Sequence, residues 1–121
     1  MKGAVSVLDD VTSAALHTAL SGLAKRQRVI ADNLANVETP GFLAGKVSFE
    51  SALASAVRSG DPSSVTPSVA RSLEPTRLNG NNVNLDEETL SNVDTGLKYQ
   101  LVLRALDAKY GLLHDAIKGG A

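Results

Sequence analysis

The stretch of residues 30–42 constrains the fold most, because a helical pattern runs into it and cannot continue beyond it. Leu34 and Val37 continue an apolar spacing of four and three residues, which marks one face of a helix. Pro40 then lacks a backbone donor and disfavours helical geometry at the residue before it. Pro40 followed by Gly41 also suits a type II turn, because glycine accepts the positive φ of the second central position. The sequence therefore predicts a long helix that ends in a tight turn.

The apolar residues upstream of this turn form one continuous seam. They recur every three or four residues over about three heptads, which is typical of a coiled coil, although an ordinary amphipathic helix of a soluble monomer is the alternative. We expect the helix to begin between Ser6 and Val11, because Ser6 and Asp9 resemble a capping box. The seam positions are Leu16, Leu20, Leu23, Gln27, Ile30 and Leu34.

Gln27 is the polar member of this seam, and two interpretations of it remain open. A buried polar group in an apolar seam commonly fixes helix register at some cost in stability. If the two long helices are antiparallel, Gln27 lies level with a polar stretch, and its amide could bond to Asp94, Lys98 or Gln100 within the subunit or in a neighbouring one. The alternative is that Gln27 points into solvent at a gap in the seam.

A second long helix is predicted from Leu85 to Ile117. Asn84 is a suitable cap for it, and acidic residues fill its first turn, as the helix dipole favours. Its apolar face consists of two neighbouring stripes, and one partner helix would cover only one of them. The other stripe would then be covered by the middle segment or by another copy of the chain. The first stripe contains Tyr99, Leu103, Leu106, Tyr110, Leu113 and Ile117, and the second contains Leu97, Leu101, Ala105, Ala108 and Leu112.

The middle of the chain carries weaker signals. Phe49, Leu53 and Val57 follow one another at a spacing of four, which predicts a short helix that Ser48 would open. Residues 60–68 contain two prolines and small polar side chains, and we expect them to form a mobile loop.

These signals predict a mainly α fold in a single domain. Residues 69–78 have no clear period and are expected to be extended or irregular, with a short strand as the alternative. The N-terminal helix, within residues 1–38, and the C-terminal helix, within residues 85–118, would pack as an antiparallel coiled-coil-like hairpin. Residues 39–84 would form a turn and an irregular, flexible middle segment.

Composition and charge exclude several classes of function. A net charge of −1 gives no electrostatic footprint for nucleic acid, and the absence of cysteine removes thiolate nucleophiles and cysteine metal sites. His17 and His114 lack a third ligand and make a poor zinc site. The sequence has neither a phosphate-binding glycine loop nor a nucleophile elbow. We therefore expect a non-enzyme without catalytic residues, metal, cofactor or small-molecule substrate.

Two strings of residues resemble a known family. The first reads Asn-X-X-Asn-X-X-Thr-Pro-Gly-aromatic and comprises Asn33, Asn36, Thr39, Pro40, Gly41 and Phe42. The second comprises Asn79, Gly80, Asn81, Asn82, Val83 and Leu85. The first resembles the N-terminal signature of the bacterial flagellar rod and hook axial proteins. The second, with the strings at 97–100 and 109–117, resembles the C-terminal half of a proximal-rod member of that family.

This resemblance implies a structural subunit of the flagellar basal-body rod, which polymerises through its terminal helices into a hollow drive shaft required for motility. The implied partners are other copies of the chain, other rod proteins, the rod adaptor FliE, and the MS-ring with its export apparatus. The resemblance also implies a periplasm-spanning location, reached by type III export without a cleaved signal peptide. The sequence alone, without a signal peptide or a membrane-spanning stretch, suggests the cytoplasm. A small soluble coiled-coil adaptor or secretion chaperone is the alternative function.

Overall fold

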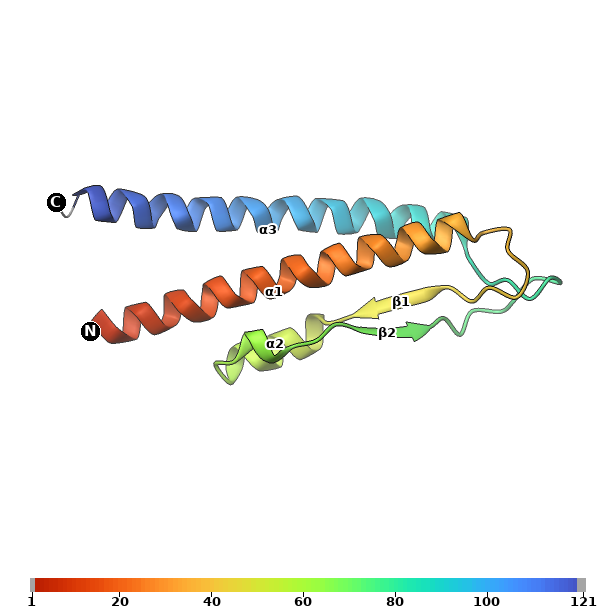
Figure 1. The fold of residues 1–121 in the computed structure, drawn as a ribbon, viewed down its shortest axis with the longest axis horizontal. Helices are drawn as coiled ribbons and strands as arrows, with labels where there is room; N and C mark the ends of the chain where they lie inside the picture. The colour runs from red at the N-terminus through yellow and green to blue at the C-terminus, as the bar shows by residue number, and fades with distance from the viewer. Residues whose placement is uncertain (1, 120–121) are drawn as a thin grey trace.

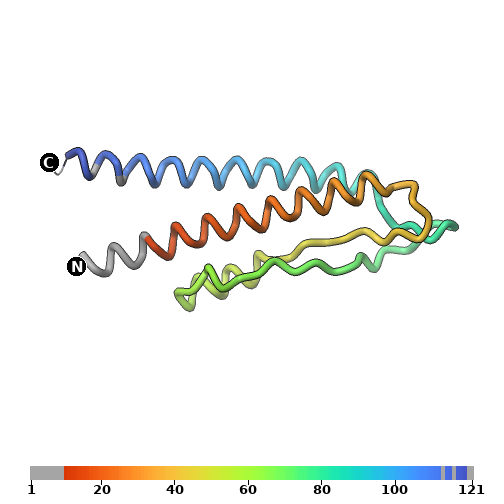
Figure 2. Tube along the Cα trace, viewed as in Figure 1, coloured from red at the N-terminus to blue at the C-terminus, as the bar shows by residue number. Residues whose placement is uncertain are grey.

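Two long helices dominate the computed structural model and lie side by side along its length (Figure 1). Helix α1 spans Lys2–Ala35 and helix α3 spans Leu85–Gly119. The structure describes residues 2–119, apart from the side chains of residues 2–9, 113 and 116. Figure 2 follows the trace along α1, out and back through the middle segment, and then along α3 in the direction opposite to α1. The predicted class, a mainly α hairpin of two long terminal helices, is confirmed.

The two helices differ in how well the sequence predicted their starts. The chain is already helical at Lys2, so the predicted start of α1 between Ser6 and Val11 is wrong. The side chains of Ser6 and Asp9, which would have formed its cap, lie outside the described residues.

The start of α3 at Leu85 is confirmed. The backbone N–H of Glu87 donates to Oδ1 of Asn84 at 3.1 Å, which is the hydrogen bond expected of an N-cap asparagine. The first backbone N–H groups of a helix have no acceptor within the helix, and this bond satisfies one of them in the acidic first turn of α3.

The middle segment forms an antiparallel two-stranded sheet with a short helix and one helical turn at its end (Figure 1). Its register pairs Gly45 with Arg71 and Ser48 with Ser68. Strand β2 confirms the short-strand alternative, whereas β1 was not predicted, because four residues that include glycine and lysine carry no strand signal. The four elements are β1 Gly45–Ser48, α2 Glu50–Arg58, the 3-10 turn η1 Pro62–Ser64 and β2 Ser68–Arg71.

One prediction for the middle segment needs correction. Helix α2 exists, but its N-cap residue is Phe49 rather than Ser48, and no side chain caps it. Residues 60–68 include the 3-10 turn η1, in which Pro62 is buried and its carbonyl accepts a bond from Oγ1 of Thr18 at 3.2 Å. This contact with α1 was not visible in the composition of the loop, and the mobility expected of the loop stays a prediction.

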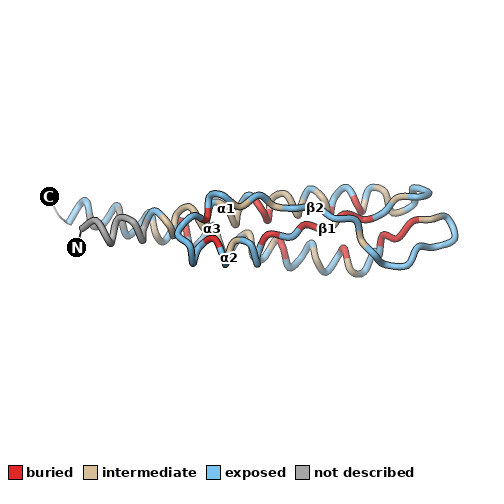
Figure 3. The backbone as a smooth tube through the Cα atoms, turned by 90° about the horizontal axis from the view of Figure 1, so that it is seen from below, coloured by how far each residue is buried: buried red, intermediate tan, exposed pale blue. Residues whose placement is uncertain are grey.

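Helix α1 lies at the centre of the molecule. It packs against α3 on one side and against β1, α2 and η1 on the other (Figure 1). Figure 3 colours the buried parts of the backbone red. Leu23, Val47 and Phe49 form a buried apolar cluster, and Tyr99 and Val102 of α3 pack against it. Within the described part of the chain, no helix has both the length and the apolar character needed to cross a membrane.

Candidate functional site

Three buried asparagines hold together the end of the molecule where α1 stops and α3 begins. Asn33, Asn81 and Asn82 are 1%, 0% and 5% exposed, respectively. A buried amide is costly unless it is hydrogen-bonded, and each of the three bonds to backbone groups of a distant segment. We call this set the asparagine clasp.

Asn33 joins α1 to the first strand. Its Oδ1 accepts from the N–H of Gly45 at 2.8 Å, and its Nδ2 donates to the carbonyl of Gly45 at 2.9 Å. A side-chain amide that pairs with both groups of one residue replaces a neighbouring strand at the sheet edge. Gly45 must remain small, because a Cβ at this position would lie 2.9 Å from Cγ1 of Val29.

Asn36 stabilises the end of α1 from within the same turn. Its Nδ2 donates to the carbonyl of Asp32 at 2.8 Å, and its Oδ1 accepts from Oγ1 of Thr39 at 3.1 Å. The N–H of Thr39 also donates to the carbonyl of Asn36 at 3.0 Å. The spacing of three residues between Asn36 and Thr39 is therefore needed for both side chains to meet.

The tight turn predicted at Pro40 and Gly41 is confirmed. The N–H of Phe42 donates to the carbonyl of Thr39 at 3.3 Å, and Gly41 has a φ of 75°. These are the closing bond and the positive second φ of a type II turn. Gly80, which has a φ of 81°, approaches this turn so closely that its Cβ would lie 3.3 Å from Cα of Gly41. Both family strings thus contribute a glycine to one backbone contact.

Asn81 fastens the start of the second family string to the turn. Its Nδ2 donates to the carbonyls of Asn36 and Thr39, both at 2.8 Å. Its Oδ1 accepts from the N–H of Val83 at 2.8 Å. One fully buried side chain therefore satisfies three backbone groups from two segments that are about forty residues apart.

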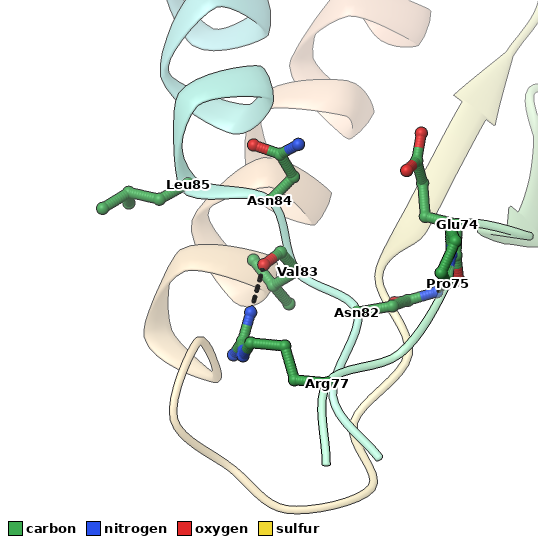
Figure 4. A pocket seen from close by; sticks show the side chains of 7 residues that line it. All are labelled: Glu74, Pro75, Arg77, Asn82, Val83, Asn84 and Leu85. Carbon is green, nitrogen blue, oxygen red and sulfur yellow. Dashed lines mark hydrogen bonds between the residues drawn. The ribbon is translucent and has the colours of Figure 1, made fainter. Parts of the chain in front are cut away.

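Asn82 and Arg77 hold the loop that leads from β2 to α3. Oδ1 of Asn82 accepts from the N–H of Ala44 at 2.7 Å, while its Nδ2 donates to the carbonyls of Ser72 and Glu74, both at 3.1 Å. Figure 4 shows the Arg77 guanidinium turned toward the carbonyl of Val83, to which it donates at 2.8 Å. Arg77 was not predicted as a site residue. An arginine in a loop gives no indication in the sequence that its guanidinium will donate to the carbonyls of Val83 and Val37, which lie 6 and 40 residues away.

A charged group links β1 to the start of α3. Nζ of Lys46 lies 2.7 Å from Oε1 of Glu87 and 2.9 Å from Oε1 of Glu88. Partial burial lowers the pKa of Lys46, but the hydrogen bonds and charges of both carboxylates outweigh this effect, so that its pKa is raised. The side chain of Glu88 is almost completely buried, and a buried carboxylate is tolerated when a cation lies beside it.

A second charged contact fixes α2 to α1. Arg26 donates to Oε2 of Glu50 at 2.9 Å and to the carbonyl of Val47 at 2.8 Å, and its guanidinium lies 5.0 Å above the Phe49 ring. The hydrogen bond from Arg26 lowers the pKa of Glu50 from 4.5 to about 2. The same ring rests on Gly22, where a Cβ would lie 2.6 Å from the ring carbon Cδ1.

The predicted seam positions of α1 all face the interior to some extent. Leu23 and Ile30 are both 3% exposed, and Leu16, Leu20, Gln27 and Leu34 are half-buried. On α3, Leu106 is buried and Tyr99 is half-buried, whereas Leu103, Tyr110 and Ile117 are exposed. The side chain of Leu113 lies outside the described residues.

Gln27 does not behave as the register hypothesis predicted within the chain. Among the described residues, its amide forms no hydrogen bond with Asp94, Lys98 or Gln100. These three side chains are exposed, and Lys98 pairs instead with Asp94 at 2.9 Å along the same helix.

One apolar stripe of α3 is left uncovered. Leu90, Val93, Leu97 and Leu101 follow one another at spacings of three or four residues, and Leu112 lies on the same face about three turns farther along. This face of the helix differs from the one that carries Tyr99 and Leu106. This uncovered stripe comprises Leu90, Val93, Leu97, Leu101 and Leu112, which are 72%, 56%, 64%, 68% and 72% exposed.

Neither histidine contributes to a metal centre in the part of the chain that the structure describes. His17 shares a hydrogen bond of 2.9 Å with the hydroxyl of Tyr110, and His114 is exposed beside Asp115. The described residues contain no group of three or more acidic, histidine or cysteine side chains that could hold a metal ion. The molecule is an elongated helical protein with a hydrogen-bonded polar junction at one end and an exposed apolar stripe on α3, an arrangement typical of subunits that assemble.

Comparison with known proteins identifies the family. Residues 15–42, which contain the end of α1 and the turn, match the family model for flagella basal body rod protein. The flagellar basal body rod protein FlgB of Bacillus subtilis is 31% identical over 118 residues, which cover 87% of this chain and 92% of that protein. FlgB of Escherichia coli is 32% identical over 84% of this chain and 89% of its own length. FlgB of Borreliella burgdorferi is 34% identical over 71% of this chain and 80% of its own length.

The chain therefore belongs to the FlgB family of flagellar basal body rod proteins. The resemblance seen in the two strings of residues is confirmed, and the expectation of a non-enzyme is confirmed with it, because the relatives are structural rod proteins. The alternative of an adaptor or secretion chaperone finds no support in these relatives.

Proposed function

We propose that this chain is a subunit of the proximal rod that polymerises through α1 and α3, with other copies of itself and with other rod proteins. In this role it helps to form the hollow drive shaft on which motility depends. The observation that carries the proposal is the uncovered stripe of α3. A stripe of five large aliphatic side chains on one helix must find a partner, since water is an unfavourable neighbour for it.

The size of the uncovered stripe supports this inference. Its five side chains expose an apolar area on the order of 500 Å², which is near the upper end of what monomeric soluble proteins show. The apolar seam of α1 is already occupied by α3 within the chain. A neighbouring helix from another subunit is therefore the surface that would cover the stripe.

The surroundings of the subunit follow from the family. We infer that the proximal end of the rod meets the adaptor FliE and the MS-ring with its export apparatus, and that the subunit reaches a periplasm-spanning rod by type III export without a cleaved signal peptide. The relatives that support this inference are FlgB proteins of the basal body rod.

We further propose that the whole chain, residues 1–121, acts as one axial domain in which the family strings set the geometry of the assembly helices. The asparagine clasp supports this view, because its bonds fix the angle between α1 and α3 from backbone groups at their junction. The exposed members of the first stripe of α3, which are Leu103, Tyr110 and Ile117, would then reach neighbouring subunits together with the uncovered stripe, while the seam of α1 packs against α3.

A double substitution on the uncovered stripe tests the proposed function. Leu90→Gln with Leu97→Gln should leave the fold of the subunit unchanged, because both side chains are largely exposed, but it should prevent rod assembly and swimming. Val57→Gln is the matched control, since Val57 is an exposed aliphatic residue on α2, away from the stripe. The measurements are swimming and recovery of rods in cells that lack their own rod subunit. Normal rods built from the double variant would refute the proposal.

A further inference from the structure

The loop between β2 and α3 presents two leucines to solvent. Leu73 is 99% exposed and Leu78 is 111% exposed, so both are as accessible as in an extended peptide. The backbone of this loop is hydrogen-bonded within the chain, because Nδ2 of Asn82 donates to the carbonyls of Ser72 and Glu74. Apolar side chains on a fixed backbone lose little conformational entropy when a partner buries them.

An apolar groove lies elsewhere on the same chain. It has a volume of about 360 Å³ and is formed by α1, α2 and α3. Its lining contains two charged residues, Glu50, whose carboxylate pairs with Arg26, and Lys98. Its lining side chains include Ala19, Leu23, Phe49, Leu53, Leu101 and Val102.

We propose that the leucines of this loop in one copy of the chain insert into the apolar groove of the next copy. The inference rests on the proposed rod function and specifies one contact of the polymer. Charge supports the pairing, since Glu74 lies exposed between the two leucines and Lys98 lines the groove, while the carboxylate of Glu50 in the same lining is already paired with Arg26. Lys98 is 51% exposed and pairs with Asp94 only as a surface contact within α3, so its ammonium can turn to a second carboxylate.

The positions of loop and groove determine the kind of assembly. In Figure 1 the loop lies at the end of the molecule where α1 and α3 are joined, whereas the groove lies beside α2, farther along the helices. A contact between two different surfaces of the same protein is heterologous, and repeated heterologous contacts give an open helical chain unless the rotation happens to close a ring. Such a contact suits a rod, because each bound copy presents a new loop and a new groove.

Cysteine cross-linking tests the contact directly, because the natural chain contains no cysteine. Leu78→Cys marks the loop and Ala54→Cys marks the groove, where Ala54 is exposed. The double variant should give a ladder of linked copies in assembling cells, and two co-expressed single variants should give a dimer linked between positions 78 and 54. Absence of the 78–54 link in cells that assemble rods would overturn the inference, as would links that join only identical positions.

A second set of variants separates this contact from the rod function itself. Leu73→Ser with Leu78→Ser should weaken self-association at least about tenfold for each leucine removed, while the fold is kept because neither side chain is buried. Thr76→Ser in the same loop and Ala52→Gln on α2 are controls that should assemble normally, whereas Ala54→Gln should not.

The outcomes of these variants are distinct. If the leucine variant builds normal rods, the groove contact is wrong and the rod function stands. If even the natural chain fails to enter rods in cells that lack their own subunit, both proposals are overturned. A small apolar molecule found in the groove by native mass spectrometry, without the 78–54 link, would also overturn the groove contact.

Discussion

Asn33→Leu is the perturbation that examines the asparagine clasp most directly. Leucine has the same branched skeleton of four side-chain heavy atoms and a good helix propensity, so α1 should tolerate it. The substitution removes both hydrogen bonds to Gly45, whose N–H and carbonyl then remain buried beside an apolar side chain. The edge of β1 would lose its connection to α1 while the helix stays intact.

The cost can be estimated from the two backbone groups that lose their partners. A buried group left without a hydrogen bond costs about 1–3 kcal/mol, so the pair should destabilise the junction by about 2–6 kcal/mol. At tenfold for every 1.4 kcal/mol, local opening of β1 should become about 30 to 20,000 times more frequent. Small domains have only about 5–15 kcal/mol of total stability, so this loss should be large enough to measure.

Hydrogen exchange followed by mass spectrometry is the suitable assay, because it reports on opening of individual segments. Peptides covering β1 should exchange faster in Asn33→Leu, whereas the central turns of α1 should change much less. Asn92→Leu is the matched control, since Asn92 lies exposed on α3 and should leave β1 unaffected. If exchange of β1 in Asn33→Leu stays within about threefold of the natural chain, the two bonds do not stabilise the junction as argued.

Four further outcomes are expected. Gly41→Val should abolish motility while export of the subunit continues, because valine is unfavourable at a φ of 75°; normal swimming would contradict the role of the turn. Gly22→Ala should cost about 1–3 kcal/mol in chemical denaturation, because its Cβ would meet an aromatic ring at 2.6 Å; Gly111→Ala, with nothing within 4 Å, should instead stabilise α3 by about 1 kcal/mol. The folded-state pKa of Glu50 is about 2, below its usual 4.5, so the stability that it contributes is complete above about pH 4.5 and is lost as the pH falls toward 2. Because Glu50 is half exposed, this difference should be about 1 kcal/mol, measured as a pH-dependent gap in unfolding free energy that disappears in Glu50→Gln. Finally, the isolated subunit should show its strongest hydrogen-exchange protection at the clasp and weak protection toward the far ends of α1 and α3, and uniformly strong protection of both helices would contradict the need for assembly partners.

Local patterns in the sequence predicted the two long helices because their signals act over a few residues. Spacing of apolar side chains, the cap at Asn84 and the turn at Pro40 and Gly41 depend only on neighbours in the chain. The same patterns could not predict that Asn33 would pair with Gly45, because an asparagine near a helix end is equally compatible with a solvent-exposed turn.

The remaining contacts depend on which segments the fold brings together. Strand β1 is defined by its pairing with β2 and by Asn33, not by its own four residues. Similarly, the sequence gives no reason for a glycine at position 22 inside a helix. The structure gives one, because the ring of Phe49 packs against Gly22 and leaves no room for a Cβ. The family strings marked the right asparagines, but only the structure shows that their amides are buried and bound to backbone.

The clasp and the uncovered stripe place different kinds of interaction at different parts of the subunit. Hydrogen bonds with fixed geometry are completed within the chain at the junction, so the angle between α1 and α3 does not need a partner to set it. Apolar surface, which tolerates many partners of suitable shape, stays exposed on α3 for the contact between copies that we propose. Under the proposed function, a chain organised in this way enters the rod with one defined geometry, because the residues that determine the geometry are different from those that contact a neighbour.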